Sequence, residues 1–230
     1  MKNYLKTYYS TEMRPVSDYP LLLASYLKEN YIHNSQNLVD IACGRGDYLR
    51  AYSKLGIEVM GVDIDPDAQD LCSPHDVKIL DISKQKIPVG DETIDCVFNK
   101  SIIEHLLEPE SLLMETHRIL KKNGIVITMC PSWVHMGWGP FYQDHTHVTP
   151  FTLPSLRDIH IKCGFEILEI KHFRQLPFLW KWPWFTLFSE LIRKLPIPYS
   201  PQHQISYPDP INKYIRFSNE VMLLCVAKKI

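Results

Sequence analysis

Residues 38–49, which read LVDIACGRGDYL, limit the fold of this chain more than any other segment. A short apolar run is followed by a turn with two glycines and then by a polar start that is typical of a helix. Gly44 and Gly46 carry no Cβ atom, so the backbone here can approach a ligand closely. A strand, a glycine turn and a helix in this order place a ligand at the carboxyl end of a strand in an open α/β sheet. The segment therefore predicts an α/β fold with a nucleotide-type cofactor at this turn.

The segment 38–172 alternates short apolar runs with helical patterns, which predicts parallel strands joined by crossover helices. The predicted strands are 38–42, 57–62, 77–80, 94–98, 125–129 and 165–170. The predicted helices are 19–31, 47–55, 67–73, 110–121 and 152–163. KKNG at 121–124 and the Cys163-Gly164 pair predict helix ends. The apolar run at 221–227 predicts a central or near-central strand.

The length of 230 residues suits one α/β domain with some elaboration. We expect an N-terminal helical segment at 1–37, a Rossmann-like core at 38–172, an insert at 173–216 and the final strand of the core at 217–230. The insert contains seven prolines and many aromatic residues. Proline disfavours one continuous helix there, although 184–195 has the spacing of a short amphipathic helix.

Charge and cysteine usage exclude several classes of protein. The net charge is -1 and no run of Lys and Arg occurs, which argues against nucleic acid as a partner. The six cysteines are scattered without a CxxC pair, as in a protein from a reducing compartment. The N-terminus lacks an apolar signal core and no stretch reaches membrane-spanning length. We therefore expect a cytoplasmic protein.

Two kinds of cofactor compete for the glycine turn. A dinucleotide fingerprint needs GxGxxG, with the pyrophosphate on the helix N-terminus. Here the three positions are Ala42, Gly44 and Asp47, and Asp47 puts a negative charge where the pyrophosphate would bind. S-adenosylmethionine has no phosphate, so this objection does not apply to it. The sequence therefore disfavours an oxidoreductase with a nicotinamide cofactor.

Two further acids lie at the ends of predicted strands. Asp63, in GVDID at 61–65, can accept hydrogen bonds from both ribose hydroxyls. Asp81 follows the next strand and can accept the adenine amino group. Either acid alone has an alternative interpretation as a loop carboxylate or a helix cap. Their order along the chain at the tips of successive strands favours a cofactor site.

Several motifs together resemble class I S-adenosylmethionine-dependent methyltransferases. VDIACGRG at 39–46 resembles their first motif, and GVDID at 61–65 resembles their second-strand acidic motif. DETIDCVF at 91–98 and IEHL at 103–106 resemble the fourth-strand region of the small-molecule branch. RILKKNGI at 118–125 resembles the helix turn before strand five. The resemblance covers residues 38–172. Ala42 stands where many members have glycine.

The resemblance implies a seven-stranded, mostly parallel sheet with helices on both faces and an antiparallel last strand near 217–228. It implies S-adenosyl-L-methionine as the cofactor and O-methylation of a small-molecule, sugar or lipid-linked acceptor. A non-catalytic subunit that binds S-adenosylmethionine or S-adenosylhomocysteine is the alternative. The cofactor-binding residues implied by the resemblance are Asp40, Ala42, Gly44, Gly46, Asp63, Ile64, Asp81, Ile82, Asn99 and Lys100.

Methyl transfer from a sulfonium needs alignment and, for a hydroxyl acceptor, a general base. Candidate bases in the loops after strands four and five are Glu104, His105, Asp144, His145 and His147. His105 could equally be structural. Asp144, His145 and His147 could line the substrate site, bond within the loop or ligate a metal with His135. The spacing matches no closed metal site, so none is predicted.

DHTHVTPFT at 144–152 is similar to a DxxHxxxFT run of the small-molecule branch, which favours a functional interpretation of these residues. NKSI at 99–102 lacks the Asn/Asp-Pro-Pro-aromatic motif of enzymes that methylate nucleobase or amide nitrogens. The aromatic insert admits three interpretations. It could form a lid over the substrate, contact a membrane surface or lipid-linked acceptor through 178–195, or provide packing or a dimer contact.

Overall fold

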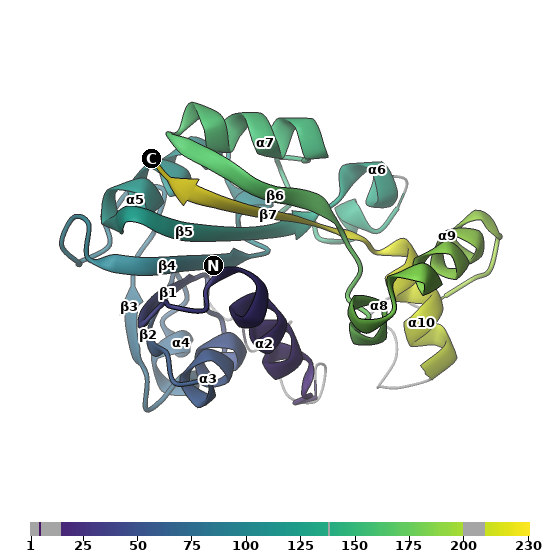
Figure 1. The fold of residues 1–230 in the computed structure, drawn as a ribbon, viewed down its shortest axis with the longest axis horizontal. Coiled ribbons are helices and arrows are strands. Elements are labelled where there is room, and N and C mark those ends of the chain that lie inside the picture. Colours follow the sequence, from purple (N-terminus) through teal and green to yellow (C-terminus); the bar gives the residue numbers. More distant parts are fainter. Residues whose placement is uncertain (1–4, 6–14, 138, 200–209) are drawn as a thin grey trace.

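The computed structural model describes residue 5 and residues 15–137, 139–199 and 210–230 (Figure 1). The strands are β1 (Asn37–Ile41), β2 (Glu58–Asp63), β3 (Asp76–Ile79), β4 (Ile94–Lys100), β5 (Leu120–Pro131), β6 (Phe165–Phe173) and β7 (Met222–Lys229). The helices are α2 (Tyr19–Tyr31), α3 (Asp47–Lys54), α4 (Asp67–Leu71), α5 (Pro109–Ile119), α6 (Trp133–Met136), α7 (Leu153–Lys162), α8 (Pro177–Lys181), α9 (Thr186–Lys194) and α10 (Pro210–Asn219). Short 3₁₀ turns are η1 (Ile103–His105), η2 (Phe141–Gln143) and η3 (Pro183–Phe185).

The strands form one seven-stranded sheet in the order β3-β2-β1-β4-β5-β7-β6. The pairs from β3 to β5 are all parallel, whereas β7 is antiparallel to both β5 and β6. The predicted fold class is confirmed, including the antiparallel last strand. The strand order reverses between β1 and β4, and in open α/β sheets this switch point is where ligands bind.

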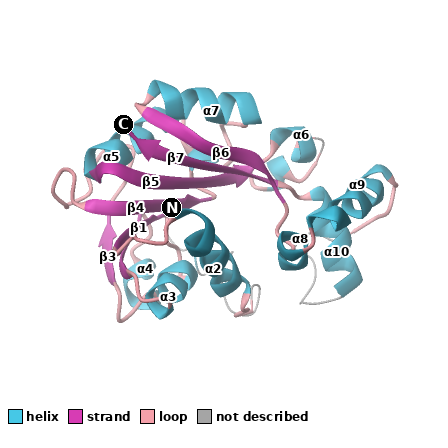
Figure 2. Ribbon diagram, in the orientation of Figure 1, coloured by secondary structure: helices cyan, strands magenta, loops and turns pink. Residues whose placement is uncertain are grey.

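Helices cover both faces of the sheet, with α5 and α7 on one side and α2, α3 and α4 on the other (Figure 2). Alternate strand residues supply the two cores. In β4, Val97 packs with α5 and α7, whereas Cys96 and Phe98 pack with α2 and α3. In β7, Leu223 and Cys225 belong to the first core, and Leu224 between them belongs to the second. Burial on both faces explains why these strands read as continuous apolar runs rather than alternating ones.

Most predicted elements lie within a few residues of their observed positions, and the run at 221–227 lies in β7, an interior strand between β5 and the edge strand β6. The predicted start of the last strand near 217 is corrected to Met222, because α10 continues to Asn219. The helix end predicted at Cys163-Gly164 is confirmed, with left-handed backbone at Gly164 (φ 89°). The helix end predicted at 121–124 is wrong, because α5 ends at Ile119 and Asn123 (φ 64°) lies within β5.

The insert forms α8, η3, α9 and α10, which gather beyond the carboxyl ends of the parallel strands, at the right of Figure 1. Trp180 of α8 anchors the insert to the core, with its ring centroid 5.2 Å from those of Tyr26 and Phe173. Arg174 forms an ion pair with Glu190 of α9. Parts of the predicted N-terminal segment (1–4 and 6–14) and of the insert (200–209) lie outside the described residues.

Candidate functional site

The turn between β1 and α3 has three residues with positive φ: Ala42 at 64°, Gly44 at 56° and Gly46 at 78°. The turn is held to β2, because the backbone N–H groups of Ala42 and Cys43 both donate to the carbonyl of Val62 at 2.7 and 3.1 Å. The strand, glycine turn and helix predicted from the sequence are therefore present. They lie at the carboxyl ends of β1 and β2.

The two glycines serve different purposes. Among the described residues, a Cβ atom on Gly44 would contact the side chain of Leu5, at 3.6 Å. A Cβ atom on Gly46 would lie 2.8 Å from Sγ of Cys72, which follows α4. The close approach of two segments thus requires Gly46, whereas the sequence pattern had predicted close approach of a ligand at both glycines. Ala42 has a left-handed backbone conformation that glycine adopts more readily.

Asp63, the last residue of β2, lies beside the glycine turn and forms a second part of the site. Its carboxylate accepts a hydrogen bond from the backbone N–H of Gly44 at 2.8 Å and one from that of Asp65 at 2.9 Å. Burial raises the pKa of Asp63, and these backbone bonds oppose the increase. Each carboxylate oxygen has a second lone pair that can accept from a ligand. The next residue, Ile64, is 45% exposed and offers an apolar surface beside it.

Asp40 lies beneath the turn in β1 and is buried. Its Oδ2 atom has no hydrogen-bond partner among the described residues. Burial raises the pKa of Asp40 well above its ordinary value, and the Lys100 ammonium opposes this increase. Asp47, by contrast, is paired with Arg45 at 2.7 Å and with Arg50 at 2.8 Å within the start of α3.

Asp81 follows β3 and caps its own turn. It accepts hydrogen bonds from the backbone N–H and the hydroxyl of Ser83 at 3.0 and 2.6 Å, and Lys84 pairs with it at 3.0 Å. The Ser83 hydroxyl is the main cause that lowers the pKa of Asp81. Ile82 beside it is mostly buried. A contact of these two residues with adenine stays a prediction.

Asn99 is held inside the core, and its Oδ1 atom has no hydrogen-bond partner among the described residues. It is buried in β4, and its amide donates to the hydroxyl of Thr128 at 3.1 Å. Thr128 in turn bonds to Nε2 of His160 at 3.0 Å, and Nδ1 of His160 bonds to the carbonyl of Leu156 at 2.7 Å. The side chain of Asn99 thus belongs to a polar network inside the core. Sequence spacing alone could not distinguish this from the expected position beside the transfer site.

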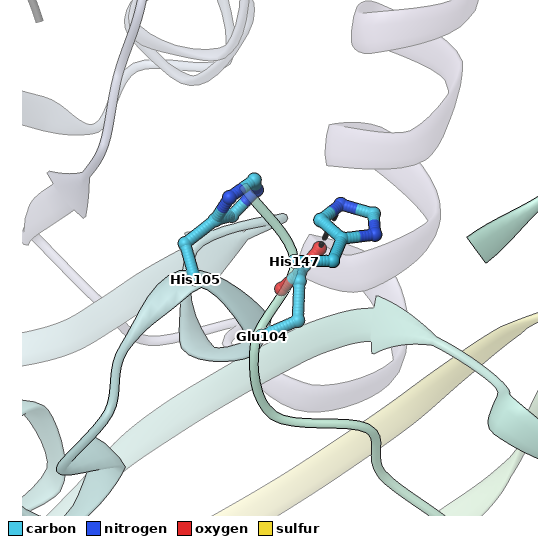
Figure 3. A group of neighbouring side chains, drawn as sticks. All are labelled: Glu104, His105 and His147. Atoms are coloured by element: carbon cyan, nitrogen blue, oxygen red, sulfur yellow. Dashed lines mark ion pairs between the residues drawn. The ribbon is translucent and has the colours of Figure 1, made fainter. Parts of the chain in front are cut away.

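A second group of side chains forms where the loop at 144–149 packs against η1. The backbone carbonyl of Glu104 accepts from the N–H groups of Val148 at 2.9 Å and Thr149 at 3.0 Å. The Thr149 hydroxyl donates to the carbonyl of Leu106 at 2.6 Å. These bonds bring His147 beside Glu104 and His105, as Figure 3 shows. The ring centroids of the two histidines lie 4.6 Å apart.

Hydrogen bonds set the tautomers of both imidazoles. Nδ1 of His147 donates to the carbonyl of Phe141 at 2.6 Å, since a carbonyl can only accept. The Thr146 hydroxyl donates to Asp144 at 2.5 Å, so Nδ1 of His105 donates to that hydroxyl at 2.9 Å. Both rings therefore carry an unprotonated Nε2 atom.

Glu104 is fully buried, and neither carboxylate oxygen has a hydrogen-bond partner within the part of the chain that the structure describes. One of these oxygens lies 4.0 Å from Nε2 of His147 (Figure 3, dashed line). Burial raises the pKa of Glu104 to about 8, and the Lys100 ammonium opposes this. Burial also lowers the pKa of His105 to about 4 and lowers that of His147. Both histidines are thus neutral at pH 7.

The other predicted residues of this region are not part of the group. His145 is exposed. His135 bonds to Ser132 at 2.9 Å, and its ring centroid lies 4.5 Å from that of His172. The ligand set considered from the sequence, with His135 and His145, is therefore not brought together. In the described ranges, Glu104, His105 and His147 are the one group of three whose potential ligand atoms all lie within 4.8 Å of one another.

Comparison with known proteins gives a consistent family. Residues 39–128 match the model of a methyltransferase domain. A ubiquinone biosynthesis O-methyltransferase from Ruegeria pomeroyi is 26% identical over 164 residues, which cover 63% of this chain and 66% of that protein. An uncharacterized methyltransferase from Mycobacterium tuberculosis is 27% identical over 110 residues, which cover 46% of this chain and 42% of that protein. The chain therefore spans less than two thirds of the length of these curated relatives.

Solved structures share the fold over nearly the whole chain. A SAM-dependent methyltransferase from Archaeoglobus fulgidus superposes with a TM-score of 0.66 at 21% identity, covering 97% of this chain and 99% of that one. A putative methyltransferase from Haloferax volcanii, solved in complex with the activator Trm112, gives a TM-score of 0.68 at 17% identity, covering 97% and 95%. No helix in the described part of the chain is long and apolar enough to cross a membrane.

Proposed function

The chain carries the methyltransferase domain of the class I S-adenosylmethionine-dependent enzymes, and from this premise we propose that it methylates an oxygen atom of a small-molecule acceptor. The observation that carries the proposal is the position of the group Glu104, His105 and His147. Glu104 and His105 follow β4 and His147 lies in the segment after β5, on the same edge of the sheet as the glycine turn. A hydroxyl acceptor needs such a group, because it must lose its proton during transfer.

The residues around the glycine turn fit S-adenosylmethionine, which supplies the activated methyl group when bound. Asp63 offers lone pairs at the tip of β2 for the two ribose hydroxyls. Ile64 offers an exposed apolar side chain for the adenine face. The unpartnered Oδ2 atom of Asp40 suits the positively charged methionine end of the molecule. A pyrophosphate group would not be stabilised here, because the first turn of α3 contains the negatively charged Asp47.

Lys100 influences both the residues proposed to bind the cofactor and those proposed to act on the acceptor. Its ammonium lowers the pKa of both Asp40 and Glu104, although burial raises each of them by more. Lys100 therefore acts on both parts of the proposed site. The two neutral imidazoles and Glu104 then promote loss of the hydroxyl proton, and Asp144 positions His105 through Thr146. His145, exposed on the same loop, is proposed to contact the acceptor from the rim.

A lipid-linked or otherwise apolar acceptor is supported by the insert. Large apolar side chains of η3 and α9 and the residues around them are exposed at the carboxyl edge of the sheet: Trp182, Trp184, Leu187, Phe188, Leu191 and Leu195. We call this set the α9 face. Lys181, Arg193 and Lys194 lie along the same segment, as in helices that bind at a membrane interface. The relative from Ruegeria pomeroyi is itself an O-methyltransferase of ubiquinone biosynthesis.

Calorimetry with S-adenosylhomocysteine tests the cofactor site. We expect binding by the wild type and a loss of about tenfold or more in affinity for Asp63→Ala, because hydrogen bonds to a charged acceptor are removed. Asp76→Ala is the matched control, since Asp76 begins β3 at the opposite edge and pairs only locally with Lys78. Equal affinities for all three proteins would contradict the assignment of Asp63.

Turnover separates the enzyme from a non-catalytic binding subunit. We expect the wild type to release S-adenosylhomocysteine in the presence of phenolic or sugar hydroxyl acceptors, including lipid-linked ones. His147→Ala is expected to keep S-adenosylhomocysteine affinity and lose this release. Tight binding without release from any hydroxyl acceptor, under conditions where a known O-methyltransferase is active, would favour the binding subunit.

A further inference from the structure

Glu104, His105 and His147 have the arrangement of ligands in an open metal site. One oxygen and two nitrogen atoms converge within 4.8 Å, and they come from η1 and from a loop about forty residues further along the chain. From this convergence we infer that the group binds one divalent transition-metal ion, of which Zn²⁺ is the best match. Two histidines and one glutamate leave a coordination position open, as in catalytic zinc sites. The sequence pattern predicted no metal site, because the spacing within one loop cannot show a group formed by two separate segments.

The first supporting observation is the state of Glu104. Its side chain is fully buried, and both carboxylate oxygens lack a hydrogen-bond partner in the described part of the structure. An unsatisfied buried carboxylate is costly, and buried carboxylates in proteins are normally paired or coordinate a metal. A divalent cation would supply the missing partner directly.

The second observation is the orientation of the histidines. Metal-binding histidines almost always donate their other ring N–H to a carbonyl, carboxylate or similar acceptor. Nδ1 of His147 donates to the carbonyl of Phe141, and Nδ1 of His105 donates to Thr146, which itself donates to Asp144. Nε2 of each ring thus keeps a free lone pair, and Nε2 of His147 lies 4.0 Å from Glu104.

The group is wider than an occupied site, since its potential ligand atoms lie within 4.8 Å of one another. Ligand atoms around a tetrahedral Zn²⁺ lie about 3.4 Å apart, as follows from metal–ligand distances of about 2.1 Å. Oε1 of Glu104 and Nε2 of His147 are 4.0 Å apart, so a small rotation of either side chain closes the difference. The open position would take the acceptor oxygen and lower its pKa. This catalytic role rests on the proposed function, whereas metal binding by itself does not.

Metal titration tests the inference without an activity assay. Protein stripped with a chelator is titrated with Zn²⁺ against a chromophoric chelator, and with Co²⁺ followed by visible absorption. We expect one ion per chain. Glu104→Gln and His147→Ala should each weaken affinity about tenfold or more and remove the Co²⁺ absorption band. Thr146→Val should weaken affinity about ten- to a hundredfold, because it removes the hydroxyl that accepts from Nδ1 of His105 and orients this ligand.

His145→Ala is the matched control, because His145 lies on the same loop but is exposed and outside the group. It should bind both ions like the wild type. Unchanged affinity in Glu104→Gln, or equal weakening in His145→Ala, would overturn the inference. Each variant is also titrated with S-adenosylhomocysteine. Retained binding shows that the variant is folded, and it separates failure of the metal site from failure of the cofactor site.

Discussion

Gly46 and Gly56 have almost the same backbone conformation, with φ values of 78° and 80°, but different surroundings. Alanine at either position costs roughly 1 kcal/mol for its left-handed backbone. A Cβ atom at 46 also collides with Cys72, whereas one at 56 meets nothing within 4 Å. We therefore expect Gly46→Ala to lower the free energy of unfolding by about 1–3 kcal/mol more than Gly56→Ala. Urea unfolding of the two variants measures this difference, and equal losses would show that Cys72 can move aside.

Of the residues in the site, the acids at the ends of strands are those that could be identified from the sequence alone. Asp63 could be identified because its position after an apolar run sets which edge of the sheet it reaches. The burial of Asn99 and the pairing of Glu104 with His147 could not be identified in this way. Both depend on contacts between segments about thirty to forty residues apart, and no local pattern encodes which of two polar residues turns inward.

At the scale of elements, the α9 face gives the clearest prediction. Leu187 is 75% exposed, and Leu191, one turn further along α9, is also exposed. We expect the wild type to bind vesicles of phosphatidylcholine and phosphatidylglycerol. Leu187→Glu combined with Leu191→Glu should weaken this binding about tenfold or more, because each leucine contributes roughly 1.5–3 kcal/mol when it leaves water. Vesicle co-sedimentation measures the effect.

Met114→Glu is the control for this prediction, since Met114 of α5 is 64% exposed but lies away from the insert. It should bind vesicles like the wild type. All variants should keep their unfolding midpoint, because these side chains contribute little to the core. No binding by the wild type at low salt would instead favour a lid or a protein contact for the α9 face.

The elements were predictable because their patterns are local. Apolar runs bounded by turn residues located every strand, and the amphipathic spacing of 184–195 located α9. Strand ends were less predictable. β5 begins at Leu120, directly after α5, because Leu120 already pairs with Ile94 across a bulge before the regular ladder starts at Ile125. Pairing of this kind depends on the neighbouring strand and has no signature in the residues themselves.

At the scale of the whole molecule, His160 makes stability depend on pH. Burial lowers its pKa to about 4, whereas an unfolded histidine has a pKa of about 6.5. Between these values the unfolded state binds more protons, so stability falls as the pH falls. At pH 5 this single residue should reduce the free energy of unfolding by about 2 kcal/mol relative to pH 7.5.

His160→Gln isolates this contribution from those of the other buried histidines. We expect the variant to lose about 2 kcal/mol less than the wild type between pH 7.5 and pH 5, whatever its stability at neutral pH. Urea unfolding at the two pH values provides the comparison. Parallel losses in both proteins would mean that Thr128 and Leu156 tolerate a charged imidazole.

The position of β7 between β5 and β6 has a consequence for how the protein is made. The ribosome completes β6 before it has synthesised residues 174–221 and then β7, the strand that joins β6 to the sheet. At about 5–20 residues per second, this interval lasts several seconds. During that time β5 is the edge of a five-stranded parallel sheet, and β6 has no neighbour to pair with. The nascent chain therefore exposes unpaired edges on β5 and on β6, to which chaperones can bind. Both edges become paired at the same time, when β7 leaves the exit tunnel.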